Sequence, residues 1–361
     1  MPAIIIATNI ARRLIRRIVR LRNPFIRATR RTKKTHERFL VRRDSYRVER
    51  EIAKVAKGTN PIIVGPWLAE VGYEVLYWVP FLRWFTHAYK INPDRIVAVS
   101  RGGVHSWYQG IAKTYIELFD EFTLKEFLAL NKARRVETES GGQKQSALSF
   151  FDHTILQRVQ KHIGTDQVQV FHPSLMFELF KQFWFGNRES KFLFRRLRLA
   201  PIVIADNTDS KRFPSGYVAV KFYTGATLPP TSQNQHTVQA LVRNLAKSKP
   251  VVLLDTALPL DEHQDFMLHD IEGVTCLPST LTPENNLEFQ TQVIAGASQF
   301  IGTCGSLAWL APIMGVPTVG VYADDKLLTT HLRVARQMYR SIGSTSFSTL
   351  DLRALTSLEL Y

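Results

Sequence analysis

The chain of 361 residues is long enough for two domains of ordinary size, and its hydrophobic (45%) and aromatic (11%) fractions are those of a globular protein. The net charge is +16, of which +13 falls in residues 1–50, so the near-neutral remainder argues against nucleic-acid binding across the folded body. The two cysteines, Cys276 and Cys304, exclude a disulfide framework and a zinc site built from cysteines alone, and they fit a reducing compartment. No apolar run is long enough for a transmembrane helix, and the run Ala3 to Ala7 is too short for the core of a secretory signal peptide.

Residues 1–57 are predicted to form a basic helical arm. No acidic residue occurs before Glu37, and apolar and basic side chains interleave at helical spacing: Ile6, Ile10, Leu14, Ile18 and Leu21 alternate with Arg12, Arg13, Arg16, Arg17 and Arg20. This pattern is typical of a helix in the headgroup region of an anionic membrane. Residues 1–36 are therefore expected to hold a cytoplasmic protein at the inner face of the membrane, without contacting nucleic acid. A solvated basic tail, a nucleic-acid arm and an organelle transit peptide remain alternatives.

Residues 58–212 are predicted to form a first α/β domain. Its first core strand is Ile62–Val64, and the helix after the following turn should kink at Pro80. Two carboxylates, Glu70 and Glu74, flank this turn at the carboxyl end of the strand, where open α/β sheets bind ligands. Both are candidate catalytic residues. A purely structural alternative for Glu74 is a first-turn glutamate favoured by the helix dipole.

The second strand of this domain is predicted over residues 95–99. The loop of small residues after it contains Arg101 and His105, which are candidates for binding an acceptor, although a solvated loop arginine is an alternative for Arg101. Helices are then expected over residues 110–119, 124–130 and 152–200, with an exposed loop over 132–146. The aromatic residues in 152–200 favour a core or a lid, with an acceptor-binding platform as the alternative.

Residues 213–335 are predicted to form a second Rossmann-like domain, followed by a tail over 336–361. Short apolar runs alternate with helix-length amphipathic segments, which indicates a parallel sheet with crossover helices. The strands are expected at 217–220, 251–254, 271–277, 299–301 and 318–322, and the helices at 234–246, 287–297, 307–314 and 328–339. The last helix is expected to cross back onto the first domain. The fold class is therefore α/β, with two Rossmann-like units facing each other across a cleft.

The turn Gly302–Ser306 is the strongest candidate for a ligand site. It places small residues and backbone N–H groups at a helix N-terminus, where partial positive charge and unpaired donors favour a phosphate. Ser306 is a plausible N-cap, and a larger residue at Gly305 would block the approach of an anion. Strand–turn–helix units of this kind also occur without any ligand, and single glycine-rich turns are weak motifs.

Two groups of residues resemble the GT-B class of nucleotide-sugar glycosyltransferases, and within it the heptosyltransferase-type families that build bacterial surface glycans. Gly72, Glu74 and Pro80 match the strand, Gly-acid pair, helix and proline with which those families open, except that Tyr73 is inserted between glycine and acid. The segment GTCGSLAWLAPIMGVPTVGVY matches their closing turn, helix and Gly-x-Pro-Thr strand entry. The resemblance covers roughly residues 60–130 and 215–335. Cys304 and Trp309 stand where these families have aspartate and histidine, so the resemblance does not specify the donor.

The resemblance implies that a nucleoside-diphosphate sugar binds the second domain and is transferred to a glycan or lipid-linked acceptor. The diphosphate would meet the N–H groups of the turn, opposite Lys221 or Thr224. The complete donor set is Lys221, Thr224, Gly225, Thr303, Cys304, Gly305, Ser306 and Leu307. Fixed dipoles and one cation suffice to stabilise a diphosphate leaving group, so no metal and no cofactor are expected.

The acceptor hydroxyl needs a general base, because an alcohol is a poor nucleophile at neutral pH. Glu74 is the first candidate and Glu70 the second, and a single displacement assisted by Glu74 would invert the anomeric configuration. Two alternatives remain open. One is a nucleotide-sugar 2-epimerase with the same two-domain architecture, and the other is a catalytically degenerate GT-B module that binds glycans.

Overall fold

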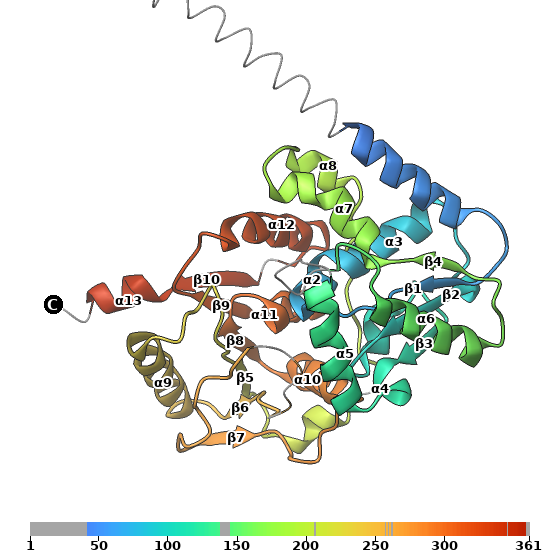
Figure 1. The fold of residues 1–361 in the computed structure, drawn as a ribbon. Coiled ribbons are helices and arrows are strands. Elements are labelled where there is room, and N and C mark those ends of the chain that lie inside the picture. Colours follow the sequence, from blue (N-terminus) through green and yellow to red (C-terminus); the bar gives the residue numbers. More distant parts are fainter. Residues whose placement is uncertain are drawn as a thin grey trace, which may run out of the picture.

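The computed structural model describes residues 42–137, 145–205, 207–256, 258, 260, 263–344 and 346–358. These residues form two parallel β-sheets with helices around them, preceded by helical residues 42–56 (Figure 1). The predicted architecture of two Rossmann-like α/β units is confirmed. The proposed membrane segment, residues 1–36, lies outside the described residues. Within the described part of the chain, no helix is long and apolar enough to cross a membrane.

The N-terminal sheet has four parallel strands in the order β3-β2-β1-β4. Their bounds are β1 Ile62–Val64, β2 Ile96–Ser100, β3 Thr114–Glu117 and β4 Gln169–Phe171. The predicted helices over 110–119 and 152–200 are wrong where β3 and β4 lie. Both are edge strands of three or four residues next to helices, so they are too short to show an alternating apolar pattern.

The helices of this domain follow the expected order with an irregular start. Their bounds are α2 Val71–Tyr73, α3 Val79–Ala88, α4 Leu118–Glu121, α5 Leu124–Glu137, α6 Phe150–Ile163, α7 Pro173–Trp184 and α8 Ser190–Phe194. Between α2 and α3 the chain forms a π-helical turn, Glu74–Trp78. Pro80 stands at the second position of α3, so the irregularity predicted at this proline occurs as the wide turn just before it.

The C-terminal sheet has six parallel strands in the order β10-β9-β8-β5-β6-β7. The strands are β5 Val218–Lys221, β6 Val251–Leu253, β7 Val274–Cys276, β8 Gln299–Thr303, β9 Thr318–Tyr322 and β10 Phe347–Asp351. Numbered within the domain, this is the doubly wound order 3-2-1-4-5-6, whose direction reverses between β5 and β8. β10 pairs with β9 over Phe347–Asp351, so the prediction that residues 336–361 form a tail is wrong.

The helices of the C-terminal domain are α9 Ser232–Ala246, α10 Asn286–Gly296, α11 Ser306–Leu310, α12 Leu328–Ser341 and α13 Leu352–Leu358. A 3-10 turn, Ala311–Met314, continues α11. Thr231 caps α9 by accepting a hydrogen bond from the N–H of Asn234, which satisfies one of the unpaired donors of the first turn.

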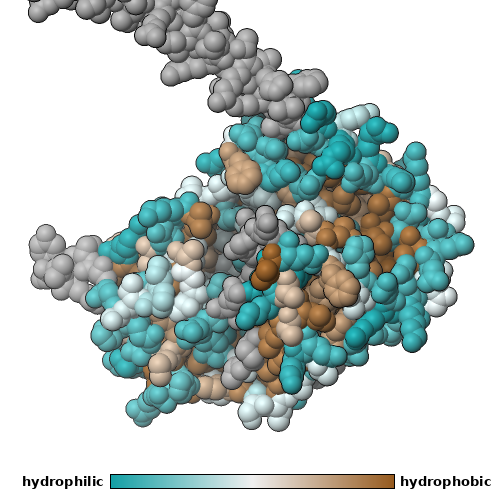
Figure 2. Space-filling view, in the orientation of Figure 1, coloured by the Kyte–Doolittle hydropathy of each residue, from teal (hydrophilic) through white to brown (hydrophobic). Residues whose placement is uncertain are grey.

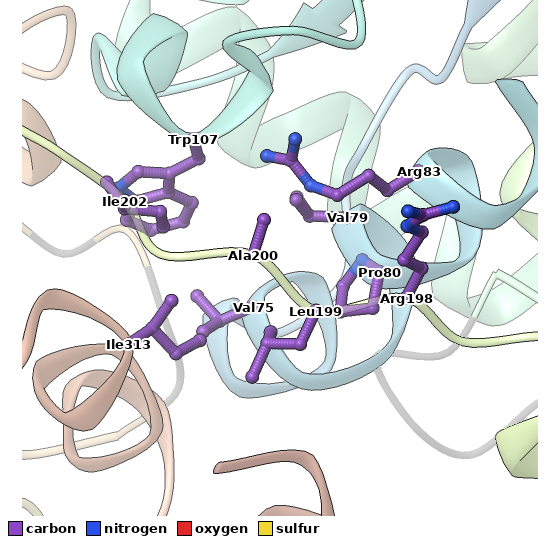
Figure 3. A pocket seen from close by; sticks show the side chains of 10 residues that line it. All are labelled: Val75, Val79, Pro80, Arg83, Trp107, Arg198, Leu199, Ala200, Ile202 and Ile313. Carbon is purple, nitrogen blue, oxygen red and sulfur yellow. The ribbon is translucent and has the colours of Figure 1, made fainter. Parts of the chain in front are cut away.

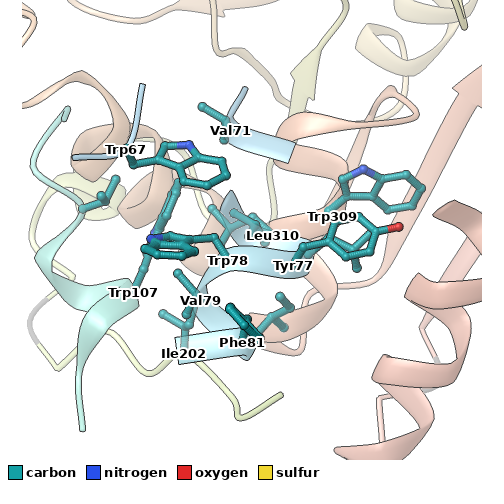
Figure 4. Packing of buried hydrophobic residues seen from close by; sticks show 14 of the residues in the cluster. Trp67, Val71, Tyr77, Trp78, Val79, Phe81, Trp107, Ile202, Trp309 and Leu310 are labelled. Carbon is teal, nitrogen blue, oxygen red and sulfur yellow. The ribbon is translucent and has the colours of Figure 1, made fainter. Parts of the chain in front are cut away.

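The two domains pack closely against each other. One cluster of buried apolar side chains joins them, and Figure 4 shows Trp78 and Trp107 of the N-terminal domain in it with Trp309 and Leu310 of α11. At Gly72 a Cβ atom would come within 2.9 Å of the backbone N of Ser306, so only glycine permits this approach of α2 to α11.

Candidate active site

The carboxyl ends of both sheets meet at one cleft between the domains. Glu70 follows β1 and Arg101 follows β2, while Lys221 ends β5 and Ser306 follows β8, and all four line it. The cleft consists of two adjoining pockets that share Tyr223, His263 and Ser306. It opens where the strand order of the C-terminal sheet reverses, between β5 and β8. Open α/β sheets bind ligands at such a point.

The turn after β8 is shaped for a close approach of other groups. Gly305 has a φ of +151°, and a Cβ atom there would lie 2.6 Å from the hydroxyl oxygen of Tyr223. Ser306 has a φ of +37°, which is rare for a residue other than glycine, and it begins α11. The first N–H groups of α11 have no acceptor within the helix, so the turn presents donors at the edge of the cleft.

Six of the eight predicted donor residues line the cleft: Lys221, Gly225, Cys304, Gly305, Ser306 and Leu307. The other two do not. The Thr303 hydroxyl accepts a hydrogen bond from the N–H of Tyr223 and donates one to its carbonyl oxygen, both at 2.9 Å. The Thr224 hydroxyl accepts a hydrogen bond from the N–H of Gln264. Both threonines therefore hold the loops in shape, and direct contact with a ligand is not supported for them.

Lys221 is the cation at the reversal point of the sheet, and two carboxylates neutralise it. Its Nζ atom lies 3.1 Å from Oδ1 of Asp255 and 2.7 Å from Oδ2 of Asp265. The lysine side chain is only 14% exposed. Burial raises the pKa of Asp255 to about 6, against the opposing effect of Lys221. An anionic ligand would thus compete with these carboxylates for the ammonium group.

Glu70 and Glu74 take different positions, although they are one helical turn apart. Glu70 is partly exposed, stands at the N-terminus of α2 and lines the cleft. Glu74 is completely buried, and its Oε1 atom accepts hydrogen bonds of 2.6 Å from the hydroxyls of Ser100 and Tyr108. It lines neither pocket of the cleft, so the expectation that Glu74 faces an acceptor across the cleft is wrong. Glu74 is the first residue of the π-helical turn.

The loop that carries Glu70 is held from two sides. The side chain of Gln145 accepts a hydrogen bond from the N–H of Leu68 (2.7 Å) and donates one to the carbonyl of Pro66 (2.8 Å). Arg101 donates to the carbonyl of Ala69 at 3.1 Å. A carboxylate on a loop fixed in this way is positioned with little conformational freedom, as a catalytic group requires.

Burial raises the pKa of Glu74 from its ordinary value of 4.5 to about 7, against the effect of its hydrogen bonds to Ser100 and Tyr108. The unfolded chain loses this proton near pH 4.5 and the folded chain only near pH 7. Stability should therefore fall as the pH rises through this window. A pKa rise of this size corresponds to about 3 kcal/mol in the free energy of unfolding.

We expect Glu74→Gln to remove this part of the pH dependence, because a carboxamide keeps an acceptor for both hydroxyls and carries no charge. The variant should match the parent protein near pH 5 and be more stable than it at pH 8. Denaturant midpoints at the two pH values measure this. If the difference between the midpoints of variant and parent is the same at pH 5 and pH 8, Glu74 does not titrate in this window. Burial also raises the pKa of Glu117 to about 7, and that background is common to both proteins.

The two predicted acceptor residues lie apart. Arg101 is 3% exposed and lines the cleft beside Ser306 and Leu307. His105 is exposed on the outer side of the same loop, where its ring lies 3.7 Å from a carboxylate oxygen of Glu288. His105 does not line the cleft, so the geometry gives no support to it as an acceptor contact. Arg101 lines the same pocket as Lys221, and its assignment to the acceptor stays a prediction.

An aromatic group that lines the cleft was not predicted. Tyr73 and Tyr77 stack with ring centroids 5.5 Å apart, and the Tyr77 hydroxyl lies 2.6 Å from Nδ1 of His331 on α12. The two tyrosines are four residues apart and so share one helix face, which was the available signal. The contact of α12 with the N-terminal domain confirms that the last predicted helix crosses back.

Two further features are excluded as ligand sites. The apolar cavity beside Arg83 and Arg198 in Figure 3 measures about 10 Å³, room for one water molecule at most. Among the described residues, no group of three or more histidine, cysteine, aspartate or glutamate side chains is placed to hold a metal ion.

No family model matches the chain, and neither does any curated protein. Among solved structures it is similar to the ADP-heptose LPS heptosyltransferase II of E. coli, with 11% identity over 81% of this chain and 90% of that one and a TM-score of 0.42. It is also similar to the glycosyl transferase family 9 structure from Veillonella parvula DSM 2008, with 12% identity over 84% of this chain and 90% of that one and a TM-score of 0.45. A third similar structure is the UDP-GlcNAc 2-epimerase of Methanocaldococcus jannaschii, with 12% identity over 81% of this chain and 88% of that one and a TM-score of 0.34. Because these TM-scores are below 0.5, the function is derived from the side chains of the cleft.

Proposed function

We propose that this protein is a glycosyltransferase that moves a sugar from a nucleoside diphosphate to a glycan or lipid-linked acceptor. One observation carries the proposal. The turn at Gly305–Ser306, with N–H groups at its helix start, and a carboxylate of the other domain, Glu70, line one pocket of the cleft. A transferase needs these two functions on opposite sides of the reacting carbon.

On the donor side, the diphosphate would lie against the turn with Lys221 beside it. As the bond to the sugar breaks, negative charge grows on the leaving diphosphate. The N–H groups at the start of α11 and the ammonium of Lys221 are fixed positive groups that stabilise this charge. Tyr223 and His263, whose rings lie 4.8 Å apart, line both pockets and would shape the space for the sugar.

On the acceptor side, Glu70 takes the role of general base. It would accept the proton of the acceptor hydroxyl while that oxygen attacks the anomeric carbon, and the diphosphate would depart from the opposite face. This single displacement inverts the configuration. Glu70 replaces Glu74 as first candidate because a base has to reach the proton that it removes, and Glu74 is enclosed by Ser100 and Tyr108.

Two measurements test the proposal. Thermal unfolding with a panel of nucleoside diphosphates should identify one that raises the unfolding temperature by several degrees, because a ligand at 100 times its Kd stabilises the native state by about 2.7 kcal/mol. The labelled sugar of that nucleotide should then appear in an acceptor. An altered sugar without an acceptor would indicate an epimerase, and binding without turnover would indicate a degenerate glycan-binding module.

We further propose, from the sequence pattern, that residues 1–36 attach the protein to the cytoplasmic face of an anionic membrane. Deleting them should abolish sedimentation with phosphatidylglycerol vesicles and leave nucleotide binding unchanged. Retained vesicle binding after the deletion would contradict this proposal. If the parent chain binds an oligonucleotide but no vesicles, and the deletion abolishes the oligonucleotide binding, residues 1–36 are a nucleic-acid arm instead.

A further inference from the structure

A second, larger groove lies next to the cleft, between α7–α8 of the N-terminal domain and α12 of the C-terminal domain. Its volume is about 1050 Å³. It is lined by Arg42, Phe183, Trp184, Gly186, Asn187, Arg188, Glu189, Ser190, Lys191, Phe192, Arg195, Arg196, Thr330 and Arg333. The proposed chemistry uses none of these residues. The face in Figure 2 is largely hydrophilic over α7 and α8.

The groove carries an excess of positive charge. Six of its lining residues are arginine or lysine and one is acidic, Glu189. Arg196 forms an ion pair with Glu49, outside the lining. Within the described part of the chain, Arg42, Arg188, Lys191, Arg195 and Arg333 form no ion pair. Several positive charges without acidic partners repel one another, so an anion that binds between them relieves this repulsion.

Arg188 shows that these cations are held in place. Its guanidinium lies 4.7 Å from the ring centroid of Phe192 and donates to the hydroxyl of Ser45 at 3.2 Å. Burial lowers the pKa of Arg188, the charges of Arg42 and Arg196 lower it further, and the charge of Glu49 opposes this effect. Arg196 also packs on the ring of Phe192, with its guanidinium 4.0 Å from the ring centroid. Arg196 already donates to Glu49 and to the carbonyl of Phe192, so of these two arginines it is Arg188 that can present its fork to a phosphate or carboxylate group.

The groove adjoins the reaction cleft. Trp184 lines the groove and packs edge-on against Tyr73 and Tyr77, with ring centroids 5.6 and 5.4 Å apart, and both tyrosines line the cleft. On α12, Thr330 and Arg333 of the groove flank His331 of the cleft. A chain-like ligand that enters the cleft from this side would pass through the groove.

We propose that this groove binds an acidic portion of the acceptor, a glycan that carries phosphate or carboxylate groups. The proposal rests on the proposed function and names the class of its acceptor. The groove is concave and mixes aromatic rings with the polar side chains of Asn187, Ser190 and Thr330, which suits sugar rings and hydroxyls. A flat anionic lipid surface would not reach into such a groove.

The test measures binding to the full-length chain by calorimetry. The probes are phosphorylated maltopentaose, trigalacturonate and neutral maltopentaose, with phosphatidylglycerol vesicles as competitor. The variants are Arg195→Glu and Arg333→Glu, one on each wall. Arg243→Glu on α9 is the matched control, because it makes the same charge change on an exposed helix outside both sites.

The proposal expects an acidic probe to bind at least tenfold more tightly than neutral maltopentaose, with an affinity that falls as salt rises. Each groove variant should weaken this binding at least tenfold and the control by less than twofold. Three results would overturn the proposal. The acidic and neutral probes could bind equally tightly, or all three variants could have the same effect. The chain could also bind the vesicles with an affinity that the groove variants leave unchanged, while it binds no acidic probe. Binding that depends on Arg195 and Arg333 in a chain that transfers no sugar would overturn the proposed function and leave an acidic-glycan site.

Discussion

Glu70→Gln should lower the rate of sugar transfer by about three orders of magnitude while nucleotide binding stays within twofold. Glutamine has the shape of glutamate but cannot accept the proton of an acceptor hydroxyl, and general-base assistance contributes roughly 10²–10⁴-fold. Glu70 lines the same pocket as Gly305 and Ser306 but comes from the other domain, and the proposal gives it the acceptor proton and no contact with the diphosphate, so donor affinity should change little. Single-turnover transfer and calorimetry with the nucleoside diphosphate measure the two effects.

Two controls show whether the effect belongs to the position of Glu70. Glu272→Gln removes an exposed carboxylate outside the cleft and should leave transfer unchanged. Glu74→Gln should keep most of the rate, because its carboxylate is enclosed by hydrogen bonds inside the domain. Full loss in Glu74→Gln with turnover retained in Glu70→Gln would return the role of base to Glu74 and would require this region to rearrange when substrates bind.

The strands that surround the cleft could be predicted from the sequence, because they are buried on both faces. Runs such as Ile62–Val64 and Thr318–Tyr322 are mostly apolar, and each directly follows a proline. The sequence does not predict β10, because Phe347–Asp351 holds only two apolar residues without regular alternation and lies partly exposed at the edge of the sheet. Edge strands are defined by their partners, and their partners are distant in sequence.

The loops that line the cleft can be predicted from the sequence, but the directions of several of their side chains cannot. The turn at Gly305 was recognised because a tight turn before a helix needs particular small residues. The sequence favours Glu74 over Glu70 because Glu74 fits the Gly-acid pattern. The hydroxyls of Ser100 and Tyr108 that enclose it come from segments 26 and 34 residues away, and no local pattern specifies them. The pairing of Lys221 with Asp265 joins loops 44 residues apart, and no local pattern specifies it.

Lys221→Met should reduce transfer by about two orders of magnitude or more and also destabilise the fold. The ammonium would stabilise charge on the leaving diphosphate, and loss of one such group typically costs 10²–10³-fold. The same substitution leaves Asp255 and Asp265 near each other without their shared cation. Breaking a buried ion pair in this way typically costs about 3 kcal/mol. A loss of transfer in this variant alone would therefore not separate catalysis from folding.

The double variant Lys221→Met, Asp265→Asn separates the two roles. It removes one of the two stranded carboxylates, so the denaturant midpoint should return most of the way to that of the parent protein, while transfer stays low. Asp265→Asn alone frees Lys221 from its nearer partner, at 2.7 Å, and should tighten nucleoside-diphosphate binding several-fold at low salt. If the double variant recovers transfer along with stability, Lys221 serves only to hold the two loops together, and the charge on the diphosphate is stabilised by the turn at Gly305 without it.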